Sequence, residues 1–161
     1  MLDVVQRGEL LAFIADQDAG AKGLFVPFFG KLASTYKSIG LLALHQNLPI
    51  ICGYAMRRSQ TRGCQYQLGT TDVIHPHEWA DHPDPLFYVT ARYTRAIEKM
   101  VRLALPQYFW MHRRWKTRPR WEREGKAMPV SVRKNLESLP WMTPAELDSL
   151  GIPIPAQDLS V

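Results

Sequence analysis

Residues 85–104 read PLFYVTARYTRAIEKMVRLA and carry the strongest helical pattern in the chain. Apolar side chains recur at steps of three and four residues from Leu86 to Ala104, and the basic side chains between them face away from that stripe. Pro106 stops the pattern, because proline cannot donate the backbone hydrogen bond that a helix interior requires. The spacing therefore predicts one amphipathic helix over about 85–104.

Three short apolar runs upstream of this helix predict strands. Residues 10–15, LLAFIA, lead into the polar cluster DQDAG at 16–20, which is typical of a buried strand that feeds a loop at its carboxyl end. Residues 48–56, LPIICGYAM, predict a second buried strand, and residues 64–73 predict a third.

Two further signals lie between the first and second runs. Residues 23–30 read GLFVPFFG, and Pro27 within them argues against a centrally paired strand. Ser34 or Thr35 is expected to cap a helix that runs to about Gln46.

The part of the chain beyond the long helix is predicted to be helical again. Residues 131–138 predict a short helix, and Thr143 with Glu146 forms a start signal for another. The residues from Ile152 onward are expected to be loose. Strands and helices alternate, so we expect an α/β protein with a partial mixed sheet flanked by helices and a helical C-terminal tail over 120–161.

The composition is that of a globular domain with one basic segment. The chain has 161 residues, of which 46% are hydrophobic and 22% charged, and this excludes disordered and collagen-like classes. Residues 112–126 hold seven basic and two acidic side chains and so account for the whole net charge of +5. Such a patch attracts nucleic acid, an anionic membrane surface or a phosphorylated substrate, unless it is only a solvated face. Two cysteines are typical of a reducing compartment.

Asp16, Gln17 and Asp18 are the first candidate site residues, because they follow a predicted strand at the end where α/β sheets place their active sites. A carboxylate in this position can orient a catalytic histidine, accept a hydrogen bond from a substrate hydroxyl or hold a cation. The same residues also suit a turn in which an aspartate bonds to nearby backbone amides. The spacing alone leaves both readings open.

Residues 107–119, QYFWMHRRWKTRP, interleave aromatic and basic side chains. Arginine forks can bind a phosphate while indoles sit at a membrane–water interface. Alternatively, the aromatic rings can stack on single-stranded bases above a basic groove. A third reading is an amphipathic element with its tryptophans in the core and its charges solvated.

Residues 75–82, HPHEWADH, contain enough ligand types for zinc. Closed zinc sites usually draw their ligands from two separated segments, and the prolines here favour a stiff exposed loop. We therefore predict no metal site. No G-x-S-x-G elbow, P-loop or G-x-G-x-x-G motif occurs in the sequence.

Taken together, the segments at 16–20, 23–30 and 107–119 resemble the lipid A biosynthesis acyltransferases, the lauroyl/myristoyl type within the lysophospholipid acyltransferase superfamily. The resemblance covers about residues 2–119. It implies a glycerolipid-acyltransferase-like fold and transfer of an acyl chain to a phosphorylated glucosamine lipid of lipopolysaccharide. The resemblance implies acyl carrier protein thioester as the donor, with no other cofactor. The implied location is peripheral, on the cytoplasmic face of the bacterial inner membrane.

The resemblance also assigns residues. Asp16, Gln17 and Asp18 match the acidic block near the acceptor site. Four basic side chains match the terminal basic motif, for which binding of acceptor phosphates or anionic headgroups is a sensible role. These four residues are Arg113, Arg114, Lys116 and Arg118.

One departure from the family affects catalysis. The superfamily uses a histidine base that is separated by four residues from an aspartate or glutamate, and no histidine of this sequence has an acid at that position. We therefore expect residues 1–119 to be the C-terminal half of an acyltransferase domain, truncated and inactive alone, and the missing N-terminal half either precedes Met1 in the native protein or lies on another chain. The alternative is a non-catalytic module that binds anionic lipid or nucleic acid through residues 108–126.

Overall fold

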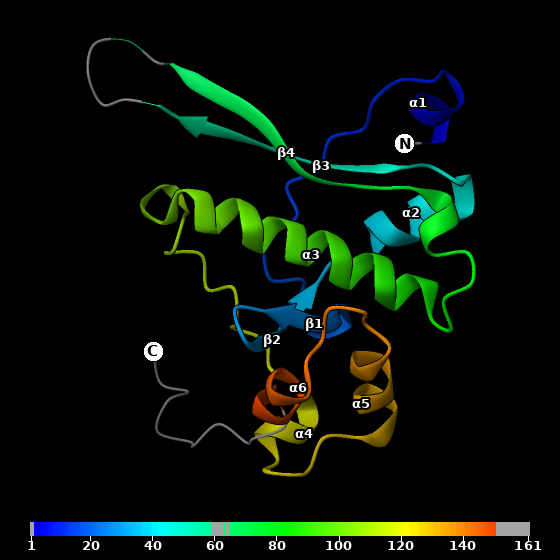
Figure 1. Ribbon diagram of the computed structural model, residues 1–161, viewed down its shortest axis with the longest axis vertical. Helices are drawn as coiled ribbons and strands as arrows, with labels where there is room; N and C mark the ends of the chain where they lie inside the picture. The colour runs from blue at the N-terminus through cyan, green and yellow to red at the C-terminus, as the bar shows by residue number, and fades with distance from the viewer. Residues whose placement is uncertain (1, 59–62, 64, 151–161) are drawn as a thin grey trace.

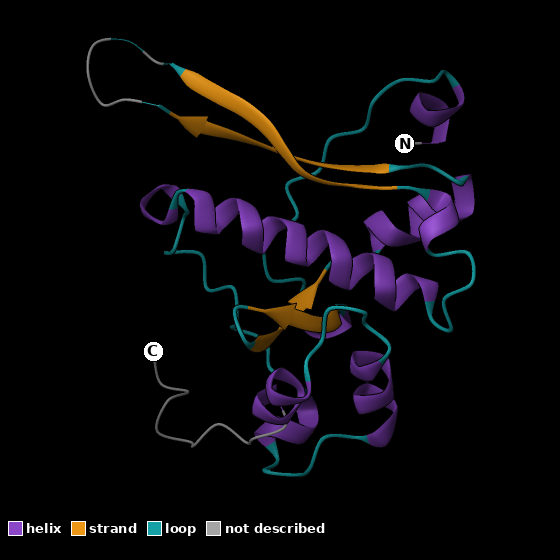
Figure 2. Cartoon of the chain, in the orientation of Figure 1, coloured by secondary structure: helices purple, strands orange, loops and turns teal. Residues whose placement is uncertain are grey.

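The computed structural model describes residues 2–58, 63 and 65–150. The tail predicted to be loose from Ile152 lies outside these residues. The chain folds around one long helix, α3 (Pro85–Leu103), which separates two antiparallel hairpins (Figures 1 and 2). The predicted α/β character is confirmed. The expected mixed sheet is wrong, because the strands that the structure describes pair only antiparallel, in two sheets of two strands each.

Helix α3 confirms the prediction made from its periodicity. Pro85 occupies its first turn, and the side chain of Asp84 caps it by accepting a hydrogen bond from the Phe87 amide at 2.9 Å. Both hairpins pack against this helix, so residues on more than one of its faces, such as Val89 and Ala91, are buried. Helix α3 therefore lies between the two hairpins and packs against both.

The first hairpin consists of β1 (Leu24–Phe28) and β2 (Lys31–Thr35). Phe29 and Gly30 form its two-residue turn, and both have positive φ, at 50° and 69°. A two-residue loop with two positive φ angles suits the twist of a hairpin. The Phe29 amide also donates to a carboxylate oxygen of Glu98 on α3 at 2.7 Å, which holds this turn against the helix.

The expectation for Pro27 is confirmed, because β1 is not a central strand, and the expected helix cap is wrong. Pro27 lies within the paired strand β1, where a two-stranded sheet leaves one edge without a partner and so tolerates a residue that cannot donate. Ser34 and Thr35 are buried in β2 and do not cap a helix. Helix α2 begins later, at Ser38, and ends at Gln46 as predicted.

The second hairpin consists of β3 (Ile50–Arg57) and β4 (Tyr66–Ile74), close to the second and third predicted strands. Its register shifts between Cys52 and Gly53. Only the face toward α3 is buried: Ile74 is inaccessible, whereas Ile51 on the opposite face is 60% exposed. The expectation of a strand buried on both faces was therefore wrong.

The first predicted strand, residues 10–15, is not a strand. Leu10 and Ile14 are largely exposed. The segment has no regular secondary structure. An apolar run becomes a strand only where a neighbour supplies backbone partners, and no described strand lies alongside it.

The C-terminal helices pack on the same core as the hairpins. Helices α5 (Val130–Glu137) and α6 (Pro144–Leu150) confirm the two predicted elements. Thr143 and Glu146 form the reciprocal cap at the start of α6, with contacts of 2.8–3.3 Å. Buried leucines of this region join the main core: Leu136, Leu139, Leu147 and Leu150.

The remaining elements are short, namely α1 (Leu2–Gln6), η1 (Gly20–Lys22), η2 (Pro76–Glu78), η3 (Leu105–Gln107) and α4 (Arg120–Arg123). No helix in the described part of the chain is long and apolar enough to cross a bilayer.

Candidate functional site

Asp18 joins the two motifs that the sequence singled out. One of its carboxylate oxygens accepts hydrogen bonds from the Gly20 amide at 2.9 Å and from the Thr117 hydroxyl at 2.8 Å. The other accepts from the Thr117 amide at 3.1 Å. The turn interpretation of the D-Q-D block therefore holds for Asp18, which also locks that turn onto a segment 99 residues further along. Thr117 is a partner that sequence reasoning missed.

Arg114 is buried against the first hairpin, with only 2% of its surface exposed. Its guanidinium donates to the Ser34 carbonyl at 2.5 Å and to the Thr35 hydroxyl at 2.6 Å, and it lies over the Phe28 ring at 5.3 Å. Burial lowers the pKa of Arg114, and the charge of Asp18 is among the influences that partly offset this effect. The guanidinium thus serves β2 as an internal hydrogen-bond donor.

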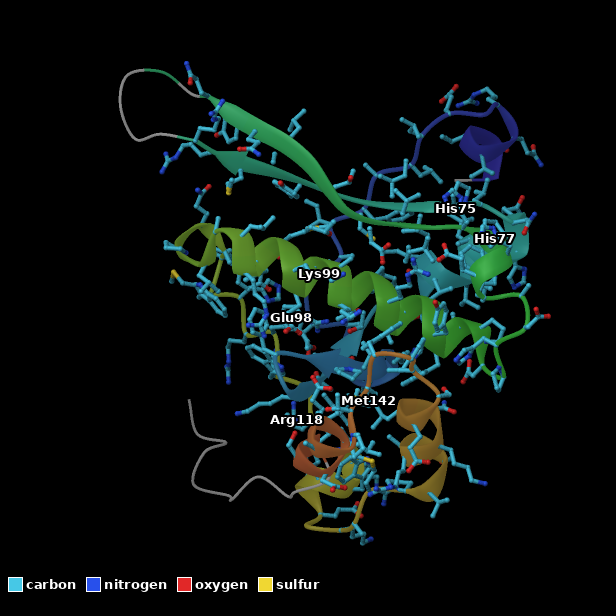
Figure 3. The ribbon with its side chains drawn as sticks, viewed as in Figure 1. His75, His77, Glu98, Lys99, Arg118 and Met142 are labelled. Atoms are coloured by element: carbon cyan, nitrogen blue, oxygen red, sulfur yellow. The ribbon has the colours of Figure 1, made fainter. Side chains whose placement is uncertain are left out.

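Arg118 is also buried, beneath the same hairpin (Figure 3). Its guanidinium donates to the Leu32 carbonyl and forms an ion pair with Glu122 at 2.6 Å. Burial raises the pKa of Glu122, and the positive charge of Arg118 counteracts that rise. Like Arg114, this arginine donates hydrogen bonds to β2. Both side chains therefore hold the basic segment against the first hairpin.

A group of buried polar atoms without a hydrogen-bond partner lies where the two motifs meet. The Tyr108 hydroxyl approaches the Asp16 carbonyl at 3.5 Å, so residue 16 lies beside the basic aromatic segment. Burial raises the pKa of Tyr108, and the negative charge of Asp16 raises it further. The buried atoms without a partner in these segments are Asp16 Oδ1, His112 Nδ1, Arg114 Nε and Trp115 Nε1.

These atoms include both acceptors and donors, and a buried polar atom without a partner is costly unless water or a ligand supplies one. A hydroxyl group can donate to the Asp16 carboxylate and accept from an arginine or indole N–H. Asp16 Oδ1 is therefore an unused acceptor at the junction, of a kind that a hydroxyl group can satisfy. Tyr108 was not among the sequence candidates, although its place in the aromatic segment could have indicated it.

The other sequence candidates lie on the surface. Gln17, Arg113 and Lys116 are all exposed. The structure therefore divides the predicted set. It brings Asp16 and Asp18 together with the basic motif, turns two arginines inward, and leaves Arg113 and Lys116 facing solvent.

The histidine loop has a structural explanation. His75 and His77 lie on the other side of α3 from Arg118 (Figure 3). The carboxylate of Glu78 pairs with Arg92 at 2.5 Å, and the His82 ring lies within hydrogen-bond distance of two backbone carbonyls. Within the described residues, no group of three or more histidine, cysteine, aspartate or glutamate side chains could hold a metal ion.

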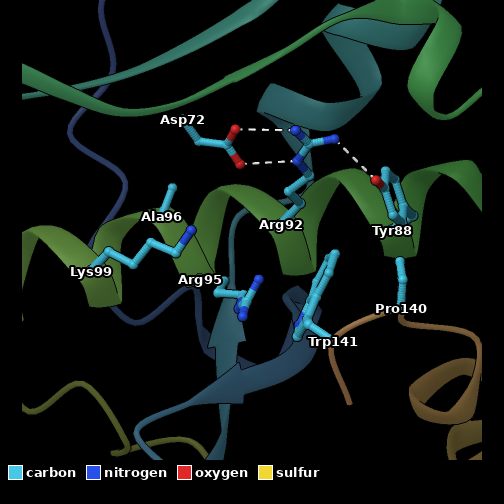
Figure 4. Close-up of a pocket in the computed structure, with 8 residues that line it drawn as sticks. All are labelled: Asp72, Tyr88, Arg92, Arg95, Ala96, Lys99, Pro140 and Trp141. Carbon is cyan, nitrogen blue, oxygen red and sulfur yellow. Dashed lines mark hydrogen bonds and ion pairs between the residues drawn. The ribbon is translucent and has the colours of Figure 1, made fainter.

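A cavity of about 230 Å³ lies between α3 and the turn at Trp141 (Figure 4). Arg92 borders it and forms two hydrogen bonds to Asp72, at 2.9 and 3.1 Å, as well as its bond to Glu78. Arg95 lies over the Trp141 ring at 5.1 Å. The cavity is lined by three basic side chains, Arg92, Arg95 and Lys99, and by one acid, Asp72, and of the three only Arg92 forms an ion pair with a described residue.

The contacts between Asp18 and Thr117 join the two segments on which the family resemblance rests. The sequence profile of the family described as "Bacterial lipid A biosynthesis acyltransferase" matches residues 1–117. The chain belongs to this family.

Curated relatives agree. The chain is 30% identical over 121 residues to the "Lipid A biosynthesis lauroyltransferase" of Escherichia coli K12, covering 74% of this chain and 38% of that protein. It is 30% identical over 122 residues to the "Lipid A biosynthesis acyltransferase" of Haemophilus influenzae, covering 74% and 37%. A "Lipid A biosynthesis palmitoleoyltransferase" of E. coli K12 is 31% identical over 121 residues, covering 74% and 37%. The matched part thus spans well under half the length of these relatives.

Proposed function

We propose that this chain contributes the acceptor-side part of an acyltransferase that moves an acyl chain from acyl carrier protein onto a phosphorylated, lipid A-type glycolipid. The contact that carries the proposal is the lock between Asp18 and Thr117, because it joins the two motifs of the family resemblance into one site. Membership of the lipid A acyltransferase family supports the reaction class.

In this reaction the acceptor hydroxyl oxygen attacks the carbonyl carbon of the thioester. A carbon–oxygen bond forms, the carbon–sulfur bond breaks, and carrier protein leaves with a free thiol. The hydroxyl proton has to pass to a base, which typically contributes about 10²–10⁴-fold to the rate. The family's histidine and acid pair is absent from residues 1–161, so the proposal assigns the role of base to none of these residues.

The residues of this chain have separate roles in the proposal. Asp16 accepts a hydrogen bond from a hydroxyl of the acceptor and so orients it. Arg113 and Lys116 are exposed beside the junction and bind the acceptor phosphate. Arg114 and Arg118 are positioning residues, because their guanidiniums are already bonded within the fold.

The acceptor is an anionic lipid, so the proposed place of work is the cytoplasmic face of the inner membrane, with the protein bound peripherally. The excess of basic side chains supports attraction to such a surface. The runner-up function, a module that binds single-stranded nucleic acid through residues 108–126, is less favoured, because Trp115 and Trp121 are partly buried and face the core.

The test measures binding of a phosphorylated glucosamine glycolipid, dispersed in detergent, by titration calorimetry. The combined change Arg113→Gln and Lys116→Gln is expected to weaken binding at least roughly tenfold, because a hydrogen bond to a charged group contributes about 1.5–3 kcal/mol. The matched control is Arg133→Gln with Lys134→Gln on α5, which removes the same two charges elsewhere. The same glycolipid without its phosphates should bind weakly to every variant.

Equal weakening in both double variants would mean that only the net charge matters, and it would contradict the assigned phosphate contact. A transfer assay with acyl carrier protein thioester extends the test, with the mass gain of the glycolipid as the measurement. This chain alone should give no product. Robust transfer that Asp16→Ala abolishes would overturn the view that the base comes from elsewhere.

A further inference from the structure

The cavity between α3 and the turn at Trp141 has one wall formed by a single face of the helix (Figure 4). Side chains three or four residues apart on a helix are neighbours, so the residues of α3 in this wall form one continuous strip. Asp72 of β4 and the turn residues Pro140 and Trp141 complete the lining. The residues that α3 contributes are Tyr88, Arg92, Arg95, Ala96 and Lys99.

The guanidinium of Arg92 is already hydrogen-bonded to protein groups. It donates twice to the carboxylate of Asp72, which is the bidentate geometry that arginine favours. It also donates to a carboxylate oxygen of Glu78 at 2.5 Å and to the Tyr88 hydroxyl at 3.0 Å. Asp72 is the one acid among the described residues that line the cavity, so the negative charge of the lining is already paired with Arg92.

Arg95 lines the same cavity and keeps its hydrogen-bond donors. Its guanidinium lies over the Trp141 ring at 5.1 Å, and it forms no hydrogen bond or ion pair with a described residue. The Trp141 ring in turn packs against that of Tyr88, with 5.7 Å between the ring centroids. A stacked guanidinium uses its face, so the N–H groups around its edge stay available. The indole therefore positions Arg95 without using its donors.

Lys99 supplies a second positive charge, four residues after Arg95 on the same strip of α3. Figure 4 shows its ammonium end directed back along the helix toward Arg95. No acid among the described residues forms an ion pair with Lys99 or with Arg95.

Glu146 is the further acid that senses the charge of Arg95. The hydrogen bonds from the Thr143 amide and hydroxyl lower the pKa of Glu146, and the positive charge of Arg95 adds to this effect. The carboxylate is nevertheless bonded to Thr143, at 2.8 and 2.9 Å, and not to the guanidinium. The cap of α6 therefore leaves the guanidinium of Arg95 available to a ligand.

This pair of cations suits a phosphoryl group. A phosphate monoester carries a charge of about −1.5 to −2 near neutral pH, which matches the combined charge of Arg95 and Lys99. Arginine binds phosphate through its planar fork, and lysine binds it as a point charge. The cavity of about 230 Å³ holds more than the phosphoryl group alone. The organic part of the ligand can therefore lie against Pro140 and the aromatic rings.

We propose that this cavity binds the phosphoryl group of a phosphate monoester. Arg95 and Lys99 bind its oxygens, and Trp141 is the residue that positions Arg95. Neither Asp18 nor Thr117 lines the cavity, so the inference goes beyond the proposed function and does not rest on it. The phosphoryl group belongs either to a soluble monoester or to a glycolipid, and the chemistry that recognises it is the same.

The test follows the indole N–H signal of Trp141 by proton–nitrogen correlation NMR, with the signal assigned by its loss in Trp141→Phe. Inorganic phosphate and glycerol phosphate are titrated at constant ionic strength, and each should shift the signal to saturation. Arg95→Gln combined with Lys99→Gln should raise the half-saturating concentration at least about tenfold, because both cations without an acid partner are removed. Both side chains are exposed, so circular dichroism should show an unchanged fold.

The matched control is Arg123→Gln combined with Lys134→Gln. It removes one arginine and one lysine that are also exposed but do not line the cavity. The half-saturating concentration should stay within about twofold of that of the unmodified chain, because salt screens distant surface charges. Equal weakening in both double variants would overturn the proposal. A signal that phosphate does not shift, or that acetate shifts at the same concentration, would also overturn it.

The phosphorylated glucosamine glycolipid, dispersed in detergent, distinguishes the two sources of the phosphoryl group. If Arg95→Gln with Lys99→Gln weakens the binding of glycolipid and glycerol phosphate alike, the glycolipid supplies the group. If only glycerol phosphate is affected, the source is a soluble monoester, and either result supports the cavity site.

The variant that tests the proposed function keeps the two proposals separate. Arg113→Gln with Lys116→Gln should leave the titration of the Trp141 signal unchanged. If that variant binds glycolipid normally while the Trp141 titration still depends on Arg95 and Lys99, only the proposed function fails. The converse result overturns only the cavity site.

Discussion

The two hairpins have similar geometry but very different surroundings. In β1–β2, Val26, Phe28, Leu32 and Ala33 are all essentially inaccessible, because α3 covers one side and the basic aromatic segment covers the other. In β3–β4 only the side toward α3 is covered, and residues such as Leu68 face outward. Both hairpins are antiparallel pairs, so the difference lies in what packs on them.

This comparison explains why part of the basic segment is buried. Its buried arginines supply hydrogen bonds to backbone and hydroxyl oxygens of β2, which lie where water cannot reach them. The second hairpin receives no such cover. Ile51 and Leu68 therefore remain exposed on its outer face. Cover by the basic aromatic segment therefore accompanies burial of the first hairpin, and the outer face of the second hairpin stays exposed.

The largest expected difference between the hairpins comes from truncating one side chain in each. Phe28→Ala should destabilise the fold by about 3–5 kcal/mol, because the ring is fully buried against Trp115 and beneath Arg114. Leu68→Ala, on the open face, should change stability by less than about 0.5 kcal/mol. Urea denaturation followed by circular dichroism measures both. Equal effects would contradict the difference in enclosure.

A glycine in each hairpin gives a second, smaller contrast. A methyl group on Gly23, just before β1, would meet the Ser34 hydroxyl oxygen at 2.1 Å and the Ala19 side chain at 2.8 Å. Gly23→Ala should therefore cost about 1–3 kcal/mol through overpacking. Gly53→Ala in β3 meets only a carbonyl oxygen, at an ordinary 3.5 Å, and should be nearly neutral. Thermal unfolding of the two variants tests the prediction, which fails if Gly53→Ala is the more damaging change.

The smallest effect concerns the ion pair that ties the open hairpin to α3. Burial alone would raise the pKa of Asp72, but the hydrogen bonds and charge of Arg92 lower it below its ordinary value. A carboxyl group whose pKa is lowered by folding stabilises the fold above its ordinary pKa, and this contribution disappears as the pH falls through the folded-state pKa. Arg92→Gln should cost about 1 kcal/mol near neutral pH.

The same change should make stability less dependent on pH in the acid range, as measured by denaturation at a series of pH values. Some acid dependence should remain, because the pKa of Glu78 is lowered chiefly by the backbone amide of His75, which the substitution leaves in place. An acid slope steeper than that of the unmodified chain would contradict the assigned role of Arg92.

Local patterns predicted the elements whose signals are contained within a few turns of chain. Helix α3 follows from its apolar period, and the start of α6 follows from the cap formed by Thr143 and Glu146. The motif at 16–20 allowed a turn as one of two open interpretations, and the structure shows that Asp18 forms that turn. The partner of Asp18, Thr117, could not be deduced, because the two residues meet only after the intervening 98 residues have folded.

By itself the sequence determined the family, the α/β character, the long helix and the concentration of positive charge, because each depends on residue types at short spacing. The tertiary structure alone decided that residues 10–15 form no strand, that Arg114 and Arg118 turn inward, and that residues 103–111 face solvent. The physical reason is the same in each case. Pairing and burial depend on which distant segment supplies a partner, and neither hydrophobicity nor charge along the chain contains that information.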